Sequence, residues 1–395
     1  MKAYFYNYLI FLLLVWSCTS QNDKKPGKFT LKGKITGQDS GIIFLSYSPS
    51  SSIRINDTAI IKNGAFNFQG SIVEPTLAQI ISENEKFSDD LYLEPGVMTL
   101  NLTNDRFRDF KMIGSKTQNE LIQLNLMLSP INKNISVLNK KRKLITDSIL
   151  NSQNSSKIIE FEKESKELEN QYSRLIKELN NTYLKFIVGN PDSYVSPYYL
   201  DILKINGIIP YDSLKLIFYG LHKNIQNSII GKKIQEEIRK KDNIQKGATV
   251  PAFKAIDSNN NTITLSQFKN KNVVIMDFWA SWCEGCRAAF PHLKDLYKKY
   301  NPQGLEIVAF EYRDINIETW LSARNHDSIN MWYNIATIFQ NGDTVNKGII
   351  DNYPLPGIPL TVLIGKDGKV IGSWMGYSNQ YVDSLDKKLS ETFKY

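Results

Sequence analysis

The segment that most restricts the fold of this chain is residues 273–286, which read Val-Val-Ile-Met-Asp-Phe-Trp-Ala-Ser-Trp-Cys-Glu-Gly-Cys. Its first half is an apolar run rich in β-branched residues, which is typical of a strand in the middle of a sheet. The segment ends in a Cys-x-x-Cys turn and leads directly into residues 284–300, which we expect to form a helix. The start of a helix stabilises a thiolate, because its free N–H groups and its dipole favour negative charge. We therefore predict an α/β domain with two thiols at the junction of a buried strand and a helix.

The cysteine pair, Cys283 and Cys286, is compatible with more than one chemistry. A structural zinc site needs four ligands, and the chain shows no second ligand pair at a suitable spacing. The other residues that could contribute are Cys18, His222, His292 and His326. A c-type haem site needs His directly after the second cysteine, where this chain has Arg287. The favoured interpretation is a redox-active dithiol without metal or separate cofactor, and a static structural disulfide remains the alternative.

A carboxylate interrupts the apolar strand before the cysteines. Asp277 should be buried there, and burying an unpaired carboxylate costs free energy. It could be a polar core residue whose hydrogen bonds are satisfied inside the protein. Alternatively, loss of water around it would raise its pKa and let it accept a proton from the second thiol, that of Cys286. Both interpretations stay open at this point.

The C-terminal part of the chain alternates between predicted strands and helices. We expect strands at 305–310, 357–364 and 370–374, and helices at 316–325 and 378–393. Residues 366–369, Lys-Asp-Gly-Lys, carry the Asp-Gly signature of a tight hairpin turn. Two β-α-β passes followed by a hairpin and a helix predict a mixed sheet with helices on both faces.

Residues 246–395 resemble the thioredoxin fold, and specifically the membrane-tethered TlpA/ResA-like thiol-disulfide oxidoreductases. The resemblance rests on the sequence Asp-Phe-Trp-Ala-Ser-Trp-Cys-x-x-Cys, on the proline in the following helix, and on Gly357-Ile358-Pro359 before the hairpin. It implies that Cys283 is the attacking thiol and Cys286 the resolving one. Peroxiredoxins share a related fold but place Thr three residues before their cysteine, where this chain has Ala280. The resemblance therefore favours disulfide exchange over peroxide reduction.

The same resemblance assigns residues to a substrate-binding groove. It implies that Pro359 is a cis-proline facing the disulfide, and that the backbone of Ile358 pairs with the substrate chain. Trp282 and Pro359 would flank the exposed sulfur. Glu284 and Gly285 lie between the cysteines, where the dipeptide tunes thiolate stability and redox potential. Because Gly285 stands where Pro is common, the redox potential is the property that the resemblance leaves open.

The N-terminal residues predict export and lipidation. Residues 1–17 contain Lys2 and then an apolar run that is short for a membrane span, which is typical of a signal peptide. A small residue followed by Cys18 resembles a bacterial lipoprotein cleavage site, and a signal peptide with an incidental cysteine is the alternative. On the first interpretation Cys18 carries lipid and residues 18–27 form a flexible tether. The mature chain then keeps only the redox pair as free thiols.

Two further regions lie between the tether and the thioredoxin-like domain. Residues 28–113 read as short strands with turn signals and predict an all-β, sandwich-like domain. They resemble an uncharacterised β-domain that precedes thioredoxin modules in envelope lipoproteins. Residues 114–245 are predicted to be helical, and Phe161, Leu168 and Leu175 recur there every seven residues. This repeat fits either a long helix packed on its own neighbours or a helix pair between chains.

The formal charge of +8 is spread along the chain, and aromatic residues do not interleave the basic ones, so we do not expect nucleic-acid binding. Taken together, the patterns and the resemblance predict a multidomain thiol-disulfide oxidoreductase that is lipid-anchored in the cell envelope and faces the periplasm. It would reduce disulfides of envelope proteins and draw electrons from a membrane donor. The alternative is a binding or scaffold lipoprotein whose cysteine pair is a structural or vestigial disulfide.

Overall fold

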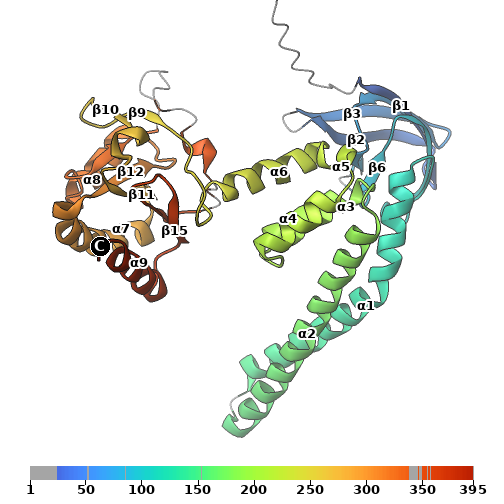
Figure 1. Ribbon diagram of the computed structural model, residues 1–395. Helices are drawn as coiled ribbons and strands as arrows, with labels where there is room; N and C mark the ends of the chain where they lie inside the picture. The colour runs from blue at the N-terminus through green and yellow to red at the C-terminus, as the bar shows by residue number, and fades with distance from the viewer. Residues whose placement is uncertain are drawn as a thin grey trace, which may run out of the picture. The chain divides into compact units, whose positions relative to one another are not determined.

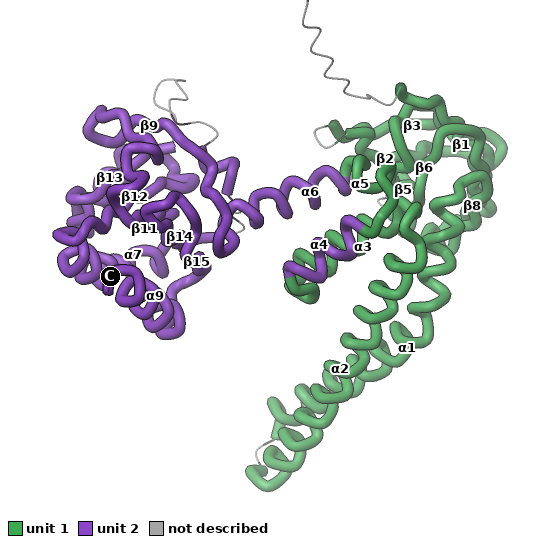
Figure 2. The backbone as a smooth tube through the Cα atoms, in the orientation of Figure 1, with its two compact units in different colours: residues 1–210, 220–229 green, residues 211–219, 230–395 purple. Residues whose placement is uncertain are grey.

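The computed structural model describes residues 25–50, 53–84, 86–152, 154–337, 346, 349–353, 355 and 357–394 (Figure 1). The predicted signal peptide, Cys18 and most of the predicted tether lie outside the described residues. The described chain forms two compact units (Figure 2). The first contains the described residues up to Pro210 together with Gly220–Ile229, and the second contains Tyr211–Tyr219 and the residues from Ile230 onward.

The first unit begins with a β-domain. Its strands are β1 (Gly27–Thr36), β2 (Ser40–Ser50), β3 (Ile53–Lys62), β4 (Ala65–Ile72), β5 (Thr76–Ser82), β6 (Leu91–Leu93), β7 (Gly96–Thr103) and β8 (Lys111–Ile113). The strand order is β6-β5-β2-β3-β4-β1-β7-β8, but within the described residues only the pair Lys62 and Ala65 joins β3 to β4. The sheet therefore opens at this hairpin into two halves, and side chains from both halves share one apolar core. The prediction of an all-β, sandwich-like domain is confirmed.

Alternation along the strands produces this core. In β1, Phe29 and Leu31 are buried, and in β4, Phe66 and Phe68 are buried, while the residues between them face outward or lie partly exposed. The hairpin between β3 and β4 turns at Asn63-Gly64, whose φ angles are 52° and 70°. Two-residue hairpin loops need positive φ at these positions, which Asn and Gly adopt readily.

The helical region follows the β-domain. Its helices are α1 (Lys116–Asn151), α2 (Ser155–Gly189), α3 (Val195–Ile205), α4 (Tyr211–Gly220), α5 (Lys223–Gln226) and α6 (Ile229–Asp242). Helices α1 and α2 lie side by side as a long antiparallel hairpin (Figures 1 and 2). Leu168 of the heptad repeat is buried, so α2 has a packing partner within the same chain. No described helix combines the length and the apolar character that crossing a membrane requires.

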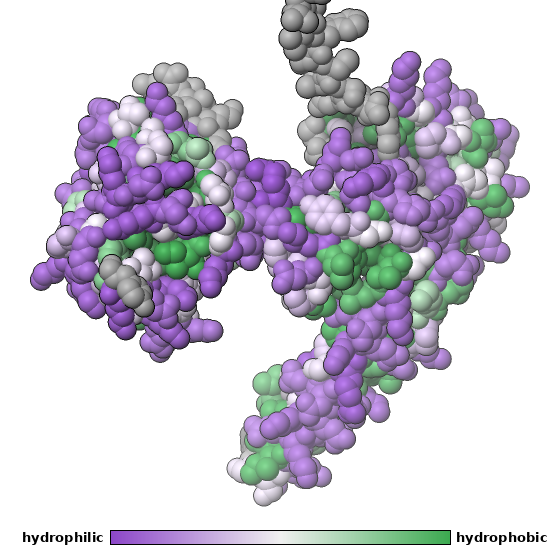
Figure 3. Space-filling view, viewed as in Figure 1, coloured by the Kyte–Doolittle hydropathy of each residue, from purple (hydrophilic) through white to green (hydrophobic). Residues whose placement is uncertain are grey.

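The base of the hairpin packs on the β-domain, whereas its far end is mostly exposed. Tyr92 of β6 shares an apolar cluster with Leu121 and Leu124 of α1 and Phe186 of α2. At the far end, hydrophilic and hydrophobic surfaces lie next to each other (Figure 3). The exposed apolar side chains near the turn are Leu144, Leu150 and Ile159. The β-domain and the first helices therefore form one folded body.

The second unit contains the thioredoxin-like domain. Its main elements are β11 (Val273–Trp279), α7 (Glu284–Tyr300), β12 (Leu305–Glu311), α8 (Ile317–His326), β13 (Tyr333–Ile335), β14 (Leu360–Ile364), β15 (Val370–Met375) and α9 (Asn379–Thr392). The sheet order is β13-β12-β11-β14-β15, with β11 parallel to β12 and antiparallel to β14. A small hairpin, β9 (Lys254–Ile256) with β10 (Thr262–Thr264), precedes this sheet. The predicted mixed sheet is confirmed, and every residue of β11 is buried at its centre.

The two faces of this sheet are covered differently. Val273, Ile275 and Trp279 of β11 belong to a core that α7, α8 and α9 complete. Val274 and Met276 point to the opposite face, where the segment before β11 and residues near Tyr353 cover the sheet. Because side chains alternate along a strand, residue 277 must point to the face covered by the α-helices. The strand thus carries a carboxylate into the layer that contains the cysteines.

Candidate active site

The site is built at the C-terminal end of β11, where the chain turns into α7. Cys283 and Cys286 form a disulfide with 5.3 Å between their Cα atoms. Cys283 is the N-cap residue of α7, and its Sγ accepts a hydrogen bond from the N–H of Cys286 at 3.2 Å. The first sulfur therefore lies where the free N–H groups of a helix stabilise negative charge.

The two sulfur positions differ in accessibility. Cys283 is 7% exposed and Cys286 is 1% exposed, while Glu284 and Gly285 between them face solvent. An external thiol or disulfide can reach the Cys283 position more easily than the Cys286 position. This asymmetry fits an attacking outer cysteine and a resolving inner cysteine.

Pro359 lies against the Cys-x-x-Cys turn from the other side of the site. The Ile358–Pro359 peptide bond is cis, as the resemblance implies. A Cβ placed on Gly285 would lie 3.9 Å from Cδ of Pro359, so the two residues are in van der Waals range. The carbonyl of Pro359 accepts a hydrogen bond from Gly376 at 2.8 Å, whereas Ile358 precedes the ladder of β14. The structure thus brings the predicted groove residues 282–285 and 358–359 to one place.

Trp282 is the exposed apolar side chain next to the outer cysteine. Its side chain is 56% exposed, and its Nε1 donates a hydrogen bond to the carbonyl of Arg313 at 3.1 Å. The carboxylate of Asp314 accepts hydrogen bonds from the N–H and the hydroxyl of Ser281. The loop after β12 therefore holds the two residues that precede Cys283.

Glu311, at the end of β12, supports that loop from inside the domain. It is fully buried and accepts hydrogen bonds from the N–H of Asp314 at 2.7 Å and from the N–H and hydroxyl of Thr337 at 2.9 and 2.6 Å. Burial raises the pKa of Glu311, while these hydrogen bonds act in the opposite direction. We did not predict Glu311 or Asp314 as site residues. For Glu311 the sequence contained a signal, because this carboxylate directly follows an apolar strand, much as Asp277 interrupts one.

Asp277 is buried in the layer that also contains Cys286. Its Oδ1 accepts a hydrogen bond from the hydroxyl of Thr361 at 3.0 Å. Burial raises the pKa of Asp277 to about 7, although the hydrogen bond from Thr361 lowers it. The carboxylate is therefore able to take up and release a proton near neutral pH.

A hollow of about 390 Å³ is lined by the two neighbours of Cys283 in the chain, Trp282 and Glu284. Trp282 lines one part of it, and Arg287 and Asp327 line another. Arg287 donates to both carboxylate oxygens of Asp327, at 2.7 and 2.9 Å. These two hydrogen bonds hold the charged part of the lining in place.

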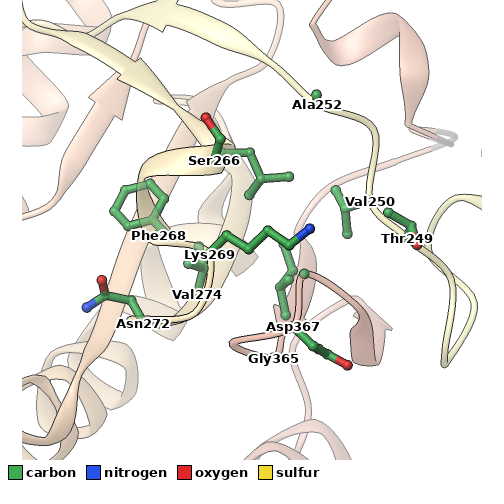
Figure 4. A pocket seen from close by; sticks show the side chains of 13 residues that line it. Thr249, Val250, Ala252, Ser266, Phe268, Lys269, Asn272, Val274, Gly365 and Asp367 are labelled. Carbon is green, nitrogen blue, oxygen red and sulfur yellow. The ribbon is translucent and has the colours of Figure 1, made fainter.

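A second hollow has a volume of about 200 Å³ (Figure 4). Its apolar lining includes Val250, Phe268 and Val274, and Lys269 extends across it (Figure 4). Val274 is at the start of β11, whereas Cys283 follows the end of that strand, so this hollow is separate from the disulfide. Within the described ranges, no three His, Cys, Asp or Glu residues are grouped as metal ligands would be.

Comparison with known proteins matches two parts of the chain. Residues 29–121 match a domain of unknown function, and residues 246–373 match the AhpC/TSA family. Thiol-disulfide oxidoreductase ResA of Bacillus subtilis (strain 168) is 33% identical over 131 residues, which are 33% of this chain and 68% of that protein. ResA of Bacillus thuringiensis subsp. konkukian is 31% identical over 154 residues, which are 38% of this chain and 81% of that protein.

A solved structure also matches part of the chain. The thioredoxin domain of a thiol-disulfide oxidoreductase from Bacteroides vulgatus is 26% identical and covers 37% of this chain and 98% of that chain, with a TM-score of 0.32. Residues 246–373, which match the AhpC/TSA family, contain the disulfide and the cis-proline.

Proposed function

This chain belongs to the ResA family of thiol-disulfide oxidoreductases, and we propose that it reduces disulfides of cell-envelope proteins while anchored to a membrane through a lipid on Cys18. The enzyme class follows from the family and from the Cys283–Cys286 disulfide in a thioredoxin-like domain. The substrates, the anchor and the electron donor are the proposed parts. The observation that carries the proposal is the asymmetric cysteine pair at the start of α7.

The reaction begins with the reduced dithiol. The thiolate of Cys283 attacks one sulfur of a substrate disulfide, forms a mixed disulfide and releases the other substrate sulfur as a thiolate that takes up a proton. The Cys286 thiol then loses its proton to Asp277, and its sulfur attacks Cys283. This step closes the Cys283–Cys286 disulfide and releases the second substrate thiolate. Two electrons pass from the enzyme to the substrate, and a membrane donor must return them.

The proposed substrate groove is supported by the contacts around the outer sulfur. Trp282, which is exposed, directly precedes Cys283, and the ring of Pro359 lies close to Gly285 of the Cys-x-x-Cys turn. The backbone of Ile358 is where an extended substrate segment would pair, and Glu284 and Gly285 are exposed beside it. An extended peptide gains affinity from main-chain hydrogen bonds of this kind, with little demand on its sequence. Such a groove suits an enzyme that acts on several envelope proteins.

The proposed location is supported by the sequence before the described residues. A short apolar run followed by Cys18 is typical of an exported lipoprotein, and lipidation of Cys18 would leave Cys283 and Cys286 as the thiols of the mature chain. Export would place the enzyme outside the cytoplasmic membrane and facing the periplasm, and the tether up to residue 27 would join its folded part to the lipid.

The experiment that tests this function is substrate trapping in cells. Cys286→Ala removes the resolving sulfur, so mixed disulfides through Cys283 should accumulate and can be identified by mass spectrometry. Cys283→Ala is the matched control, and it should trap nothing because the outer sulfur is absent. If Cys286→Ala traps no more than this control, the disulfide is structural, and the alternative of a binding or scaffold lipoprotein is favoured. If wild-type substrates become more oxidised when the enzyme is removed, the direction is reduction.

A further inference from the structure

A chain of two hydroxyl groups leads to the buried carboxylate of Asp277. In the sheet register, Thr361 of β14 lies opposite Asp277 of β11, and its Oγ1 donates to Oδ1 of Asp277 at 3.0 Å. The same Oγ1 lies 3.3 Å from the phenol oxygen of Tyr381 on α9, and either oxygen can be the donor there. All three side chains are buried. The disulfide chemistry described above uses neither Thr361 nor Tyr381.

This chain of hydroxyls lies in the layer of the inner cysteine. Tyr381 belongs to the same apolar core as Cys286, and side-chain alternation along β11 directs Asp277 into that core. Water is largely excluded there, so hydrogen bonds to a charge are stronger than at the surface. The protonation of Asp277 must therefore depend on the few groups that reach it.

In the described part of the chain, β12, β14, α7 and α9 surround the layer into which Asp277 points. On β12 its partner in the ladder is Ala309, which is apolar, and on α7 Cys286 belongs to the core of that layer. On α9, the phenol of Tyr381 is the facing group. Other ionisable groups lie near Tyr381. The rings of Tyr377 and His292 contact its ring, and Asp386, which is hydrogen-bonded to His292 at 2.7 Å, interacts with Tyr381 electrostatically.

A hydroxyl has one proton to donate, and its direction depends on the charge of its partner. When Asp277 is ionised, Thr361 donates to it and can accept the proton of Tyr381. When Asp277 is protonated, the carboxylic acid can donate to Thr361, and Thr361 can then donate to Tyr381. The three groups have one hydrogen-bonded arrangement for each charge state. The arrangement in which Thr361 donates favours the ionised carboxylate.

We propose that Thr361 and Tyr381 are positioning residues that set the pH range over which Asp277 accepts the proton of Cys286. This inference rests on the proposed function of Asp277 in the resolving step. Thr361 acts directly through its hydrogen bond to the carboxylate. Tyr381 acts through Thr361, because accepting a hydrogen bond makes the Thr361 hydroxyl a better donor.

The test measures the titration of Asp277 itself. Purified oxidised protein labelled with 13C at aspartate carboxyl carbons is titrated by NMR, and Asp277→Asn identifies the resonance. Thr361→Val keeps the shape of the side chain and removes the hydroxyl. We expect the titration midpoint of Asp277 to rise by about one pH unit in this variant. The reason is that a hydrogen bond to a charged group stabilises it by at least the free energy that corresponds to one pKa unit. Thr361→Ser keeps the hydroxyl and should restore the wild-type midpoint.

Two tyrosine variants test the hydroxyl of Tyr381. Tyr381→Phe should raise the midpoint in the same direction by a smaller amount. Tyr377→Phe removes a phenol that contacts the ring of Tyr381 and should leave the midpoint unchanged. Wild-type midpoints in both Thr361→Val and Tyr381→Phe would overturn the inference. If Thr361→Val does not fold, Tyr381→Phe decides the question, and a wild-type midpoint in that variant overturns the inference.

A kinetic measurement links the titration to the reaction. The rate at which Cys286 resolves a preformed mixed disulfide between Cys283 and a labelled peptide is followed against pH. Its midpoint should move upward with that of Asp277 in each variant. A shifted NMR midpoint with an unchanged rate profile would overturn the link to Cys286. Failure of the wild-type protein to form any mixed disulfide would instead contradict the proposed function, while the titration would still report on Thr361 and Tyr381.

Discussion

Replacing Asp277 with Asn should remove a pH-dependent cost of folding from the thioredoxin-like unit. The substitution keeps the size of the side chain and leaves an oxygen for the hydrogen bond from Thr361. It removes a carboxylate that is buried in the layer between β11 and the α-helices. The consequence can be worked out from the pKa of the group in the folded and unfolded chain.

The pKa of Asp277 is about 7 in the folded protein, against 3.8 for an ordinary aspartate. The folded protein therefore holds its proton to a higher pH than the unfolded chain does. From this group, the free energy of unfolding is at its full value below about pH 4, falls as the pH rises to about 7, and stays low above that. One pKa unit corresponds to about 1.4 kcal/mol, so the total loss is about 4 kcal/mol.

The assay is urea unfolding followed by tryptophan fluorescence at about pH 4 and about pH 8. Apart from Trp16 in the predicted signal peptide, the tryptophans all lie in the thioredoxin-like unit, so the signal reports on its unfolding. They are Trp279, Trp282, Trp320, Trp332 and Trp374. The free energy of unfolding of Asp277→Asn, relative to that of wild type, should be about 4 kcal/mol higher at the upper pH than at the lower pH. Asp383→Asn, on the exposed side of α9, is the control, and its free energy of unfolding relative to wild type should be the same at both pH values.

One result would refute this reasoning. If the stability difference between Asp277→Asn and wild type is the same at both pH values, Asp277 does not change its proton affinity on folding. Burial would then not control the charge of this carboxylate, and its role as a proton acceptor near neutral pH would lose its physical basis.

Three further substitutions test other parts of the proposal. Cys283→Ser should leave the fold intact and abolish disulfide reduction, because a hydroxyl at the start of α7 is not ionised; turnover at the wild-type rate would contradict this. Cys18→Ser should move the protein from the membrane to the soluble fraction, and recovery of unmodified wild-type protein in the soluble fraction would argue against lipidation. Glu311→Gln places an amide N–H₂ among buried donors, so it should lower the free energy of unfolding by about 1–3 kcal/mol. It should also make Trp282 more accessible to a fluorescence quencher, and unchanged quenching would disprove the link through Asp314.

The local elements around the cysteines were predictable because their signals are local. The strand 273–279 and the helix 284–300 form at the predicted residues. Three local patterns specify these elements from neighbouring residues alone: an apolar β-branched run, two cysteines at fixed spacing and an amphipathic stretch. Cys283, Cys286 and the interrupting carboxylate of Asp277 could be selected on that basis. The all-β and helical character of the two preceding regions was also available from local patterns.

The order in which the strands pair was not available from those patterns. In the β-domain, β1 pairs with β4 and with β7, and within the described strands β3 and β4 are paired in the ladder only at Lys62 and Ala65. Alternation specifies which side of a strand is apolar, but it does not specify which other strand covers it. That choice depends on how the whole set of apolar faces can be buried together.

The same division holds within the active site. The sequence determined the disulfide, because the two thiols are separated by two residues and the helix that follows them is encoded locally. Only the tertiary structure decided the surroundings of Asp277. Thr361 lies 84 positions along the chain and reaches the carboxylate because β14 pairs with β11 in one particular register. A register shift of one residue would turn Thr361 to the other face of the sheet, and nothing in the residues near Thr361 specifies that register by itself.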